Sequence, residues 1–139
     1  MNEKADQSIR EGARLDLRLD LRVLRWSLAA VWIATGAVVL GIYPREGSLA
    51  LLARAGLGGN LALLALFGGA LLDLGFGCLT LWWPRRWLWR AQAAVIVVYS
   101  AIITVALPEF WIHPFGPLLK NLPILAIIWL LHQQEGGRR

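Results

Sequence analysis

The sequence predicts an all-α protein, a membrane-spanning four-helix bundle with an amphipathic N-terminal segment, on two observations. First, 58% of the 139 residues are hydrophobic and only 17% are charged, against about 25% charged residues in an average soluble domain. Second, the charges lie at the ends: residues 1–25 hold 11 of the 23, and residues 132–139 hold three more. The nine charges left for residues 26–131 are too few for the surface of a soluble domain.

The composition also excludes several classes of protein. The richness in Leu, Ile, Val and Trp excludes a disordered chain, and the single Cys78 excludes a disulfide scaffold. The net charge of +5 does not require nucleic acid. Basic and aromatic residues do alternate over residues 82–90, but that segment joins two apolar runs, which favours an interfacial turn held against anionic lipid headgroups.

Four apolar runs account for the predicted spans, each bounded by Pro, Arg or Gly. A membrane helix needs about 20 mostly apolar residues. The runs cover residues 26–43, 61–83, 91–107 and 117–131, and the last is the least regular. The predicted organisation is therefore a charged amphipathic tail (1–25), a four-helix transmembrane domain (26–132) and a cytoplasmic C-terminal tail (133–139).

The distribution of Lys and Arg predicts the orientation. With the N-terminus in the cytoplasm, 11 basic residues lie inside and three outside. We therefore expect a multi-pass protein of a bacterial-type inner (cytoplasmic) membrane, with both termini cytoplasmic. The aromatic residues fit belts at the two interfaces. The predicted inner belt is Trp26, Trp82, Trp83, Trp87, Trp89 and Trp129, and the outer one is Tyr43 and Trp111.

The N-terminal tail has a repeat of four residues. Arg14, Arg18 and Arg22 form one row, and Asp16 and Asp20 form another. This spacing favours a helix that lies at the inner interface or docks on a partner. A solvated leader that frays is the alternative.

Asp73 is the one charge inside the second run, where it costs about 2.5–3.5 kcal/mol on an insertion scale. It shares a stripe of small residues with Ala65, Gly69 and Gly77, so we expect it to face the bundle. Tyr99, Ser100 and Thr104 lie at the same depth on the third run, and Ser100 and Thr104 share a helical row with Gln92. We predict that Asp73 bonds to the Tyr99/Ser100 region. Asp73 is then either interhelical glue or part of a proton or substrate path.

Residues 108–123 contain four prolines and Gly116, which forbid one regular helix. We expect this segment to cap the outer mouth of the bundle or to form a re-entrant turn. Glu109 is the expected partner of Lys120. No metal site is predicted, because His113 and Glu109 lack a third ligand. The expected cap residues are Glu109, Trp111, His113, Lys120 and Asn121.

The same segment resembles a signature of DoxX-like membrane proteins, reading Pro-Glu-Phe-Trp-Ile-His-Pro-Phe-Gly-Pro-Leu-Leu-Lys-Asn-Leu-Pro. Trp32 with Thr35-Gly36, and residues 72–75 around Asp73, resemble other marked positions of that family. The similarity covers roughly residues 20–132. The resemblance implies a four-helix membrane bundle. One DoxX-like protein is the membrane subunit of a thiosulfate:quinone oxidoreductase, and other relatives resemble accessory partners in redox homeostasis.

Three functions are compatible with the sequence. The first is a non-catalytic accessory or anchoring subunit of a larger redox complex in the membrane. The sequence lacks a complete set of catalytic residues, which favours a protein that is not an enzyme. The second is a quinone-linked oxidoreductase membrane subunit, with quinone as the cofactor and an intramembrane polar cluster as the site. Its candidate catalytic residues are Asp73, Tyr99, Glu109, His113 and Lys120. The third and weakest is a small transporter. The expected partners are the lipid bilayer and other membrane-protein subunits or a homo-oligomer, with no nucleic acid.

Overall fold

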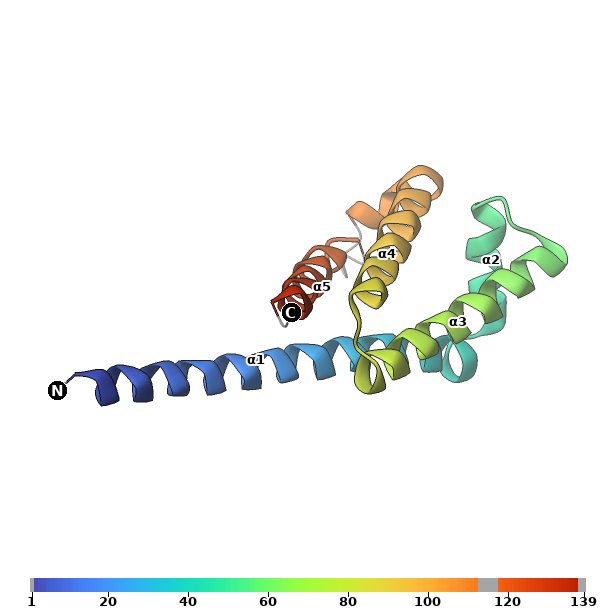
Figure 1. Cartoon of the computed structure of the whole chain (residues 1–139). Helices are drawn as coiled ribbons and strands as arrows, with labels where there is room; N and C mark the ends of the chain where they lie inside the picture. The colour runs from blue at the N-terminus through green and yellow to red at the C-terminus, as the bar shows by residue number, and fades with distance from the viewer. Residues whose placement is uncertain (1, 113–117, 138–139) are drawn as a thin grey trace.

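The computed structural model describes residues 2–112 and 118–137, and the described residues are helices joined by short turns. The all-α class is confirmed. Figure 1 shows two helix pairs: α1 packs along α3, and α4 packs along α5. Side chains rather than close backbone contact link α3 to α4, although a three-residue turn joins them. The predicted bundle is therefore an assembly of two pairs.

The first helix is longer than the first predicted span. α1 covers Glu3–Ala37 and continues through a π-helical segment, Val38–Ile42, because no proline interrupts the chain before Pro44. The tail is thus helical, as its four-residue repeat indicates, and it extends the axis of the first span beyond the other helices (Figure 1). A tail turned along the inner interface is not observed, because the helix has no break between residues 25 and 26.

Proline and glycine fix the other boundaries. Pro44 starts a short helix that the sequence analysis did not predict, α2 (Arg45–Arg54), and this helix ends before Gly56, whose φ is +90°. α3 (Gly59–Trp82) ends before Pro84, and α4 (Arg86–Ala106) ends before Pro108. A 3₁₀ turn (Pro108–Trp111) follows, and the last helix is α5 (Asn121–Gly136).

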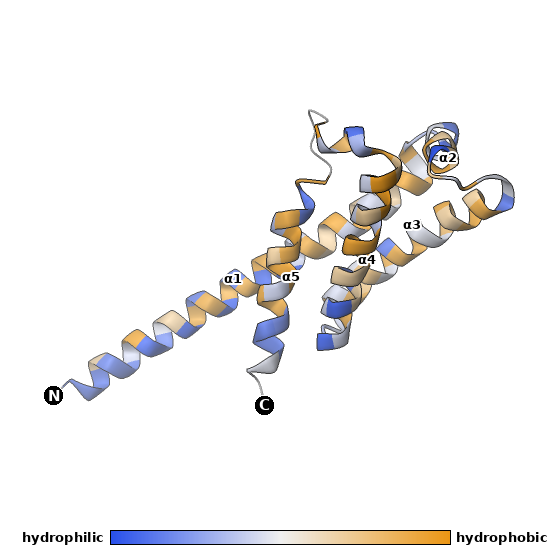
Figure 2. Cartoon of the chain, turned by 90° about the horizontal axis from the view of Figure 1, so that it is seen from above, coloured by the Kyte–Doolittle hydropathy of each residue, from blue (hydrophilic) through white to orange (hydrophobic). Residues whose placement is uncertain are grey.

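Three helices in the described part are long and apolar enough to cross a membrane: Glu3–Ile42, Gly59–Trp82 and Arg86–Ala106. α5 has 16 residues, which corresponds to about 24 Å of helix against a hydrocarbon core of about 30 Å. The fourth crossing, the even number of crossings and the cytoplasmic termini stay predictions. Figure 2 shows the contrast between the polar N-terminal part of α1 and the apolar remainder.

The core lies where the two pairs meet. Trp32 packs edge-on against Phe76, with ring centroids 5.1 Å apart. Residues from α4 and α5 complete this cluster, among them Trp89, which is 1% exposed. The placement of Trp89 in the inner aromatic belt was therefore wrong: it lies in the first turn of α4 and faces the core. Trp26, Trp82, Trp83, Trp87 and Trp129 are each at least half exposed.

Candidate functional site

A buried glutamine joins three helices at the centre of the molecule. Gln92, in the second turn of α4, is fully buried. Its Oε1 accepts a hydrogen bond from Trp32 Nε1 of α1 at 3.0 Å, and its Nε2 donates to Thr80 Oγ1 of α3 at 2.7 Å. We call Trp32, Gln92 and Thr80 the Gln92 node. Because one amide serves both neighbours, the node fixes α4 against the α1–α3 pair.

The sequence analysis had placed Gln92 only on the row of Ser100 and Thr104. The feature of the sequence that could have indicated its role is a neutral amide in an apolar segment, because such an amide must find hydrogen-bond partners once it is buried. Gln92 is not among the ionisable residues that mark a functional candidate within a membrane span, because an amide carries no charge. The node is a structural contact with both ends satisfied.

Asp73 lies on the buried face of α3, with 8% of its surface exposed. The Tyr99 hydroxyl reaches α3 from α4 and lies 3.4 Å from where a Cβ on Gly69 would stand, one helical turn from Asp73. In the described part of the chain, no hydrogen bond to the Asp73 carboxyl is found. The proposed bond between Asp73 and the Tyr99/Ser100 region therefore stays a prediction, although the structure brings Tyr99 to the same face.

Ser100 and Thr104 contact the outer segments of the chain. Asn121 Nδ2, at the start of α5, donates to Ser100 Oγ at 2.9 Å. Trp111 Nε1 donates to Thr104 Oγ1 at 3.1 Å, and Thr104 Oγ1 donates to the Ser100 carbonyl at 2.6 Å. These bonds attach the 3₁₀ turn and the N-terminus of α5 to α4. Two of the predicted cap residues, Trp111 and Asn121, are thereby brought together on α4.

Glu109 forms an ion pair with Arg54 of α2, not with Lys120 as the sequence suggested. The pairing with Lys120 was wrong because α2, which was not predicted, brings a guanidinium to the C-terminal end of α4. A backbone hydrogen bond and the Arg54 guanidinium hold the pKa of Glu109 below its ordinary value. Lys120 is exposed at the start of α5, and His113 lies outside the described residues.

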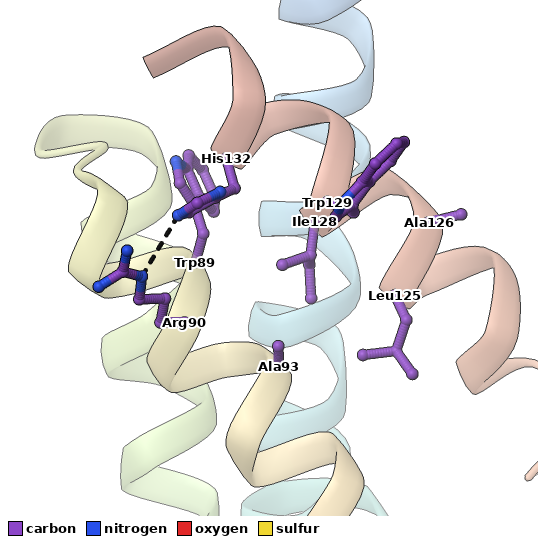
Figure 3. Close-up of a pocket in the computed structure, with 8 residues that line it drawn as sticks. All are labelled: Trp89, Arg90, Ala93, Leu125, Ala126, Ile128, Trp129 and His132. Carbon is purple, nitrogen blue, oxygen red and sulfur yellow. Dashed lines mark hydrogen bonds between the residues drawn. The ribbon is translucent and has the colours of Figure 1, made fainter. Parts of the chain in front are cut away.

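A cavity of about 510 Å³ opens between the first two turns of α4 and the middle of α5. Figure 3 shows two aromatic rings and the pair Arg90–His132 at its wall; Arg90 Nε donates to His132 Nε2 at 3.3 Å. His132 follows the predicted fourth span, and burial, then Arg86 and Arg90, lower its pKa. The lining residues are Trp89, Arg90, Ala93, Leu125, Ala126, Ile128, Trp129 and His132.

The candidate catalytic residues do not form one cluster. Asp73 and Tyr99 lie near one another between α3 and α4, whereas Glu109 and Lys120 lie at the outer end. Over residues 2–112 and 118–137, no three His, Cys, Asp or Glu side chains come together as metal ligands. What the arrangement offers is one buried carboxyl, one satisfied amide node and one largely apolar cavity with a basic edge.

Comparison with known proteins gives a family but no individual relative. No curated protein and no solved structure matches the chain. The sequence profile described as the DoxX-like family matches residues 29–129, which include the Gln92 node, Asp73 and most of α5 and leave the N-terminal tail outside. This match covers well over half of the chain, so the protein belongs to the DoxX-like family.

Proposed function

We propose that this protein is a non-catalytic accessory or anchoring subunit of a larger membrane complex, with a redox enzyme as its partner. The observation that carries the proposal is a row of exposed apolar side chains over residues 15–26 of α1. Leu15, Leu19, Val23 and Trp26 recur at helical spacing and are between 58% and 65% exposed.

Except for Trp26, the row precedes the first predicted span, so lipid does not cover most of it when α1 crosses the membrane. Because α1 is straight through residues 25 and 26, the tail extends away from the bilayer instead of lying in it. Large apolar side chains that share one face of a helix in water are commonly buried against a partner. A helix of another membrane subunit is the partner that this geometry fits.

The redox character of the complex rests on the family. The resemblance implies relatives that serve quinone-linked and redox-homeostasis systems. The matched region begins at residue 29, after the tail, so the tail is the part of this chain that can differ in partner choice.

Co-purification after gentle solubilisation tests the proposal. The wild type is expected to retain a different polypeptide, identified by native mass spectrometry. The double variant Leu15→Gln/Leu19→Gln should lose that polypeptide at unchanged yield. The matched control Ile112→Gln, which changes an 89% exposed side chain beyond α4, should retain it. A lone protomer, a second copy of this chain, or retention by the double variant contradicts the proposal.

The cavity between α4 and α5 favours a second candidate, a quinone-linked oxidoreductase membrane subunit. Its volume and mostly apolar wall suit a quinone ring, and Arg90, His132 and Trp129 offer polar groups at the edge. These are not the residues that the sequence suggested. The affinity for a short-chain quinone should fall about tenfold in Arg90→Ala, and Arg85→Ala should bind as the wild type does. Equal affinity in both variants contradicts this candidate.

The transporter alternative depends on the proline-rich segment, part of which lies outside the described residues, and it stays a prediction.

A further inference from the structure

We propose that the inner end of the molecule holds a specific site for the phosphate headgroup of an anionic phospholipid. The site is a second cavity, of about 530 Å³, between the tail of α1, the first turn of α4 and the end of α5. It is separate from the apolar row on the tail and does not rest on the function proposed above.

One face of the tail supplies the charge. Arg14, Arg18, Arg22 and Arg25 all line the cavity. At about 100° per residue they fall within a sector of roughly 80°. Asp16 and Asp20 point to the other side of the helix. Ion pairs in the described part of the chain leave these four guanidinium groups without a carboxylate partner.

Two buried donors in the same wall have no partner. Trp89 Nε1 and Arg25 Nε are both shielded from solvent and make no hydrogen bond within residues 2–112 and 118–137. Trp89 is 1% exposed and lines the cavity together with Arg25. A buried donor without an acceptor destabilises the folded protein. An anion with several oxygen acceptors would satisfy both donors at once.

The α5 side of the cavity supplies one acidic group and no further formal charge. Glu135 lines it and has an interaction of its own, so four guanidinium groups and one carboxylate leave a net charge of +3. This charge suits a phosphate group, and Gln134 adds an amide to the wall. Figures 1 and 2 show α5 passing across α1, with which it is in contact, and residues of both helices share the cavity wall.

The end of the cavity that adjoins the first predicted span, at Arg22, Arg25 and Trp89, favours a lipid headgroup over free phosphate. Arg25 and Trp89 lie beside the exposed Trp26 and Trp87, whose rings suit the headgroup layer. Basic pockets between helices at the cytoplasmic surface recognise anionic headgroups in membrane proteins. A phosphodiester held there would join the tail of α1 to the end of α5.

The test measures binding to the full chain in a mild, uncharged detergent, by native mass spectrometry and thermal shift. The probes are dioctanoyl phosphatidylglycerol, dioctanoyl phosphatidylcholine and inorganic phosphate. We expect phosphatidylglycerol to bind and raise Tm, and the other two probes to have little effect. Arg18→Gln/Arg22→Gln, which changes two exposed side chains, should weaken phosphatidylglycerol binding at least about tenfold.

Two further variants separate a built site from diffuse attraction. Lys4→Gln/Arg10→Gln also removes two positive charges from α1, but at positions outside the cavity, and should keep the wild-type affinity. Trp89→Phe keeps a large ring and removes the N–H donor, and should weaken binding about fivefold. The proposal is overturned if the two double variants lose affinity equally, if Trp89→Phe binds as the wild type does, or if phosphatidylcholine binds as well as phosphatidylglycerol. Stronger binding of inorganic phosphate overturns the assignment to lipid.

Discussion

Two buried polar side chains in the helical core have opposite surroundings. Gln92 is fully buried, and both its acceptor and its donor groups are bonded, to Trp32 and Thr80. Asp73 is 8% exposed, and no hydrogen bond to its carboxyl is found in the described part of the chain. The first site has what a structural contact requires, whereas the second has a polar group still to be satisfied.

This difference indicates that Gln92 should be tested for a structural role and Asp73 for a functional one. A buried polar group that is satisfied contributes to stability, and its loss leaves partners unpaired. A buried carboxyl without a bonded partner costs stability, so its presence in an apolar span calls for another explanation, such as a ligand or a proton path. The following variants test the comparison, beginning with the largest expected effect.

Gln92→Leu should have the largest effect on the free energy of unfolding. It removes the hydrogen bonds from Trp32 Nε1 and to Thr80 Oγ1, and we expect the free energy of unfolding to fall by about 3 kcal/mol. Denaturation in mixed micelles measures it. The control Gln133→Leu makes the same change at an exposed position of α5 and should shift stability by no more than about 0.5 kcal/mol. Similar losses in the two variants would remove the distinction on which the comparison rests.

Gly36→Ala tests whether close steric fit holds α1 against α3. A Cβ on Gly36 would stand 2.8 Å from both the Ala70 carbonyl oxygen and Leu74 Cγ. We expect a loss of about 2 kcal/mol in micelle denaturation, because the backbone cannot yield cheaply. In the same helix pair, Gly68 has nothing within 4 Å of its Cβ position. Gly68→Ala should therefore leave stability unchanged or raise it, and a comparable loss there would contradict close packing as the cause.

Trp32→Phe sharpens the account of the Gln92 node. The ring contact with Phe76 is retained while the hydrogen bond to Gln92 Oε1 is lost, so we expect about 1 kcal/mol of destabilisation. Combined with Gln92→Leu, the change should cost less than the sum of the two single changes. Additive losses in this double-mutant cycle would show that the two side chains act independently.

Asp73→Asn should change the free energy of unfolding by less than about 0.5 kcal/mol, because the substitution preserves shape and breaks no bond present in the structure. The measurement is the same micelle denaturation, run beside Gln92→Leu. A loss as large as that of Gln92→Leu would place Asp73 among the structural contacts.

Glu109→Gln is the smallest of the expected effects and depends on pH. The folded state holds the pKa of Glu109 below its ordinary value of 4.5, so the carboxylate stabilises the protein above that pH. This contribution is lost as the pH falls from 4.5 through the lower folded pKa. Tm of the wild type should therefore exceed that of Glu109→Gln at neutral pH, and the difference should shrink with acidification. A difference that grows towards low pH contradicts the ion pair with Arg54.

The positions of the helices could be predicted from the sequence because their causes are local. Continuous apolar runs end at Pro44, Pro84 and Pro108, and the four-residue repeat of the tail indicates a helix. Long-range pairing could not be predicted in the same way. The Arg54–Glu109 pair depends on α2, whose sequence is neither long nor strongly patterned, so the nearest cation in sequence, Lys120, was a poor guide.

The candidate site was predictable only in part. Asp73 carries a charge in an apolar span and is conspicuous, whereas Gln92 is neutral and acquires its importance from two residues 12 and 60 positions away. The face of α1 that meets α5 was also hidden, because the row of arginines indicates a helix but not the element that it faces.

The most direct test of the central claim measures the separation of the two helix pairs in a lipid bilayer. Spin labels replace Leu71 of α3 and Leu130 of α5, both exposed, in a Cys78→Ala background. Pulsed electron paramagnetic resonance then gives the distribution of distances between the labels. We predict one narrow distribution for the otherwise unchanged protein and for Asp73→Asn, and a broad or shifted one for Gln92→Leu. A narrow, unshifted distribution in Gln92→Leu, with broadening in Asp73→Asn, would contradict the account.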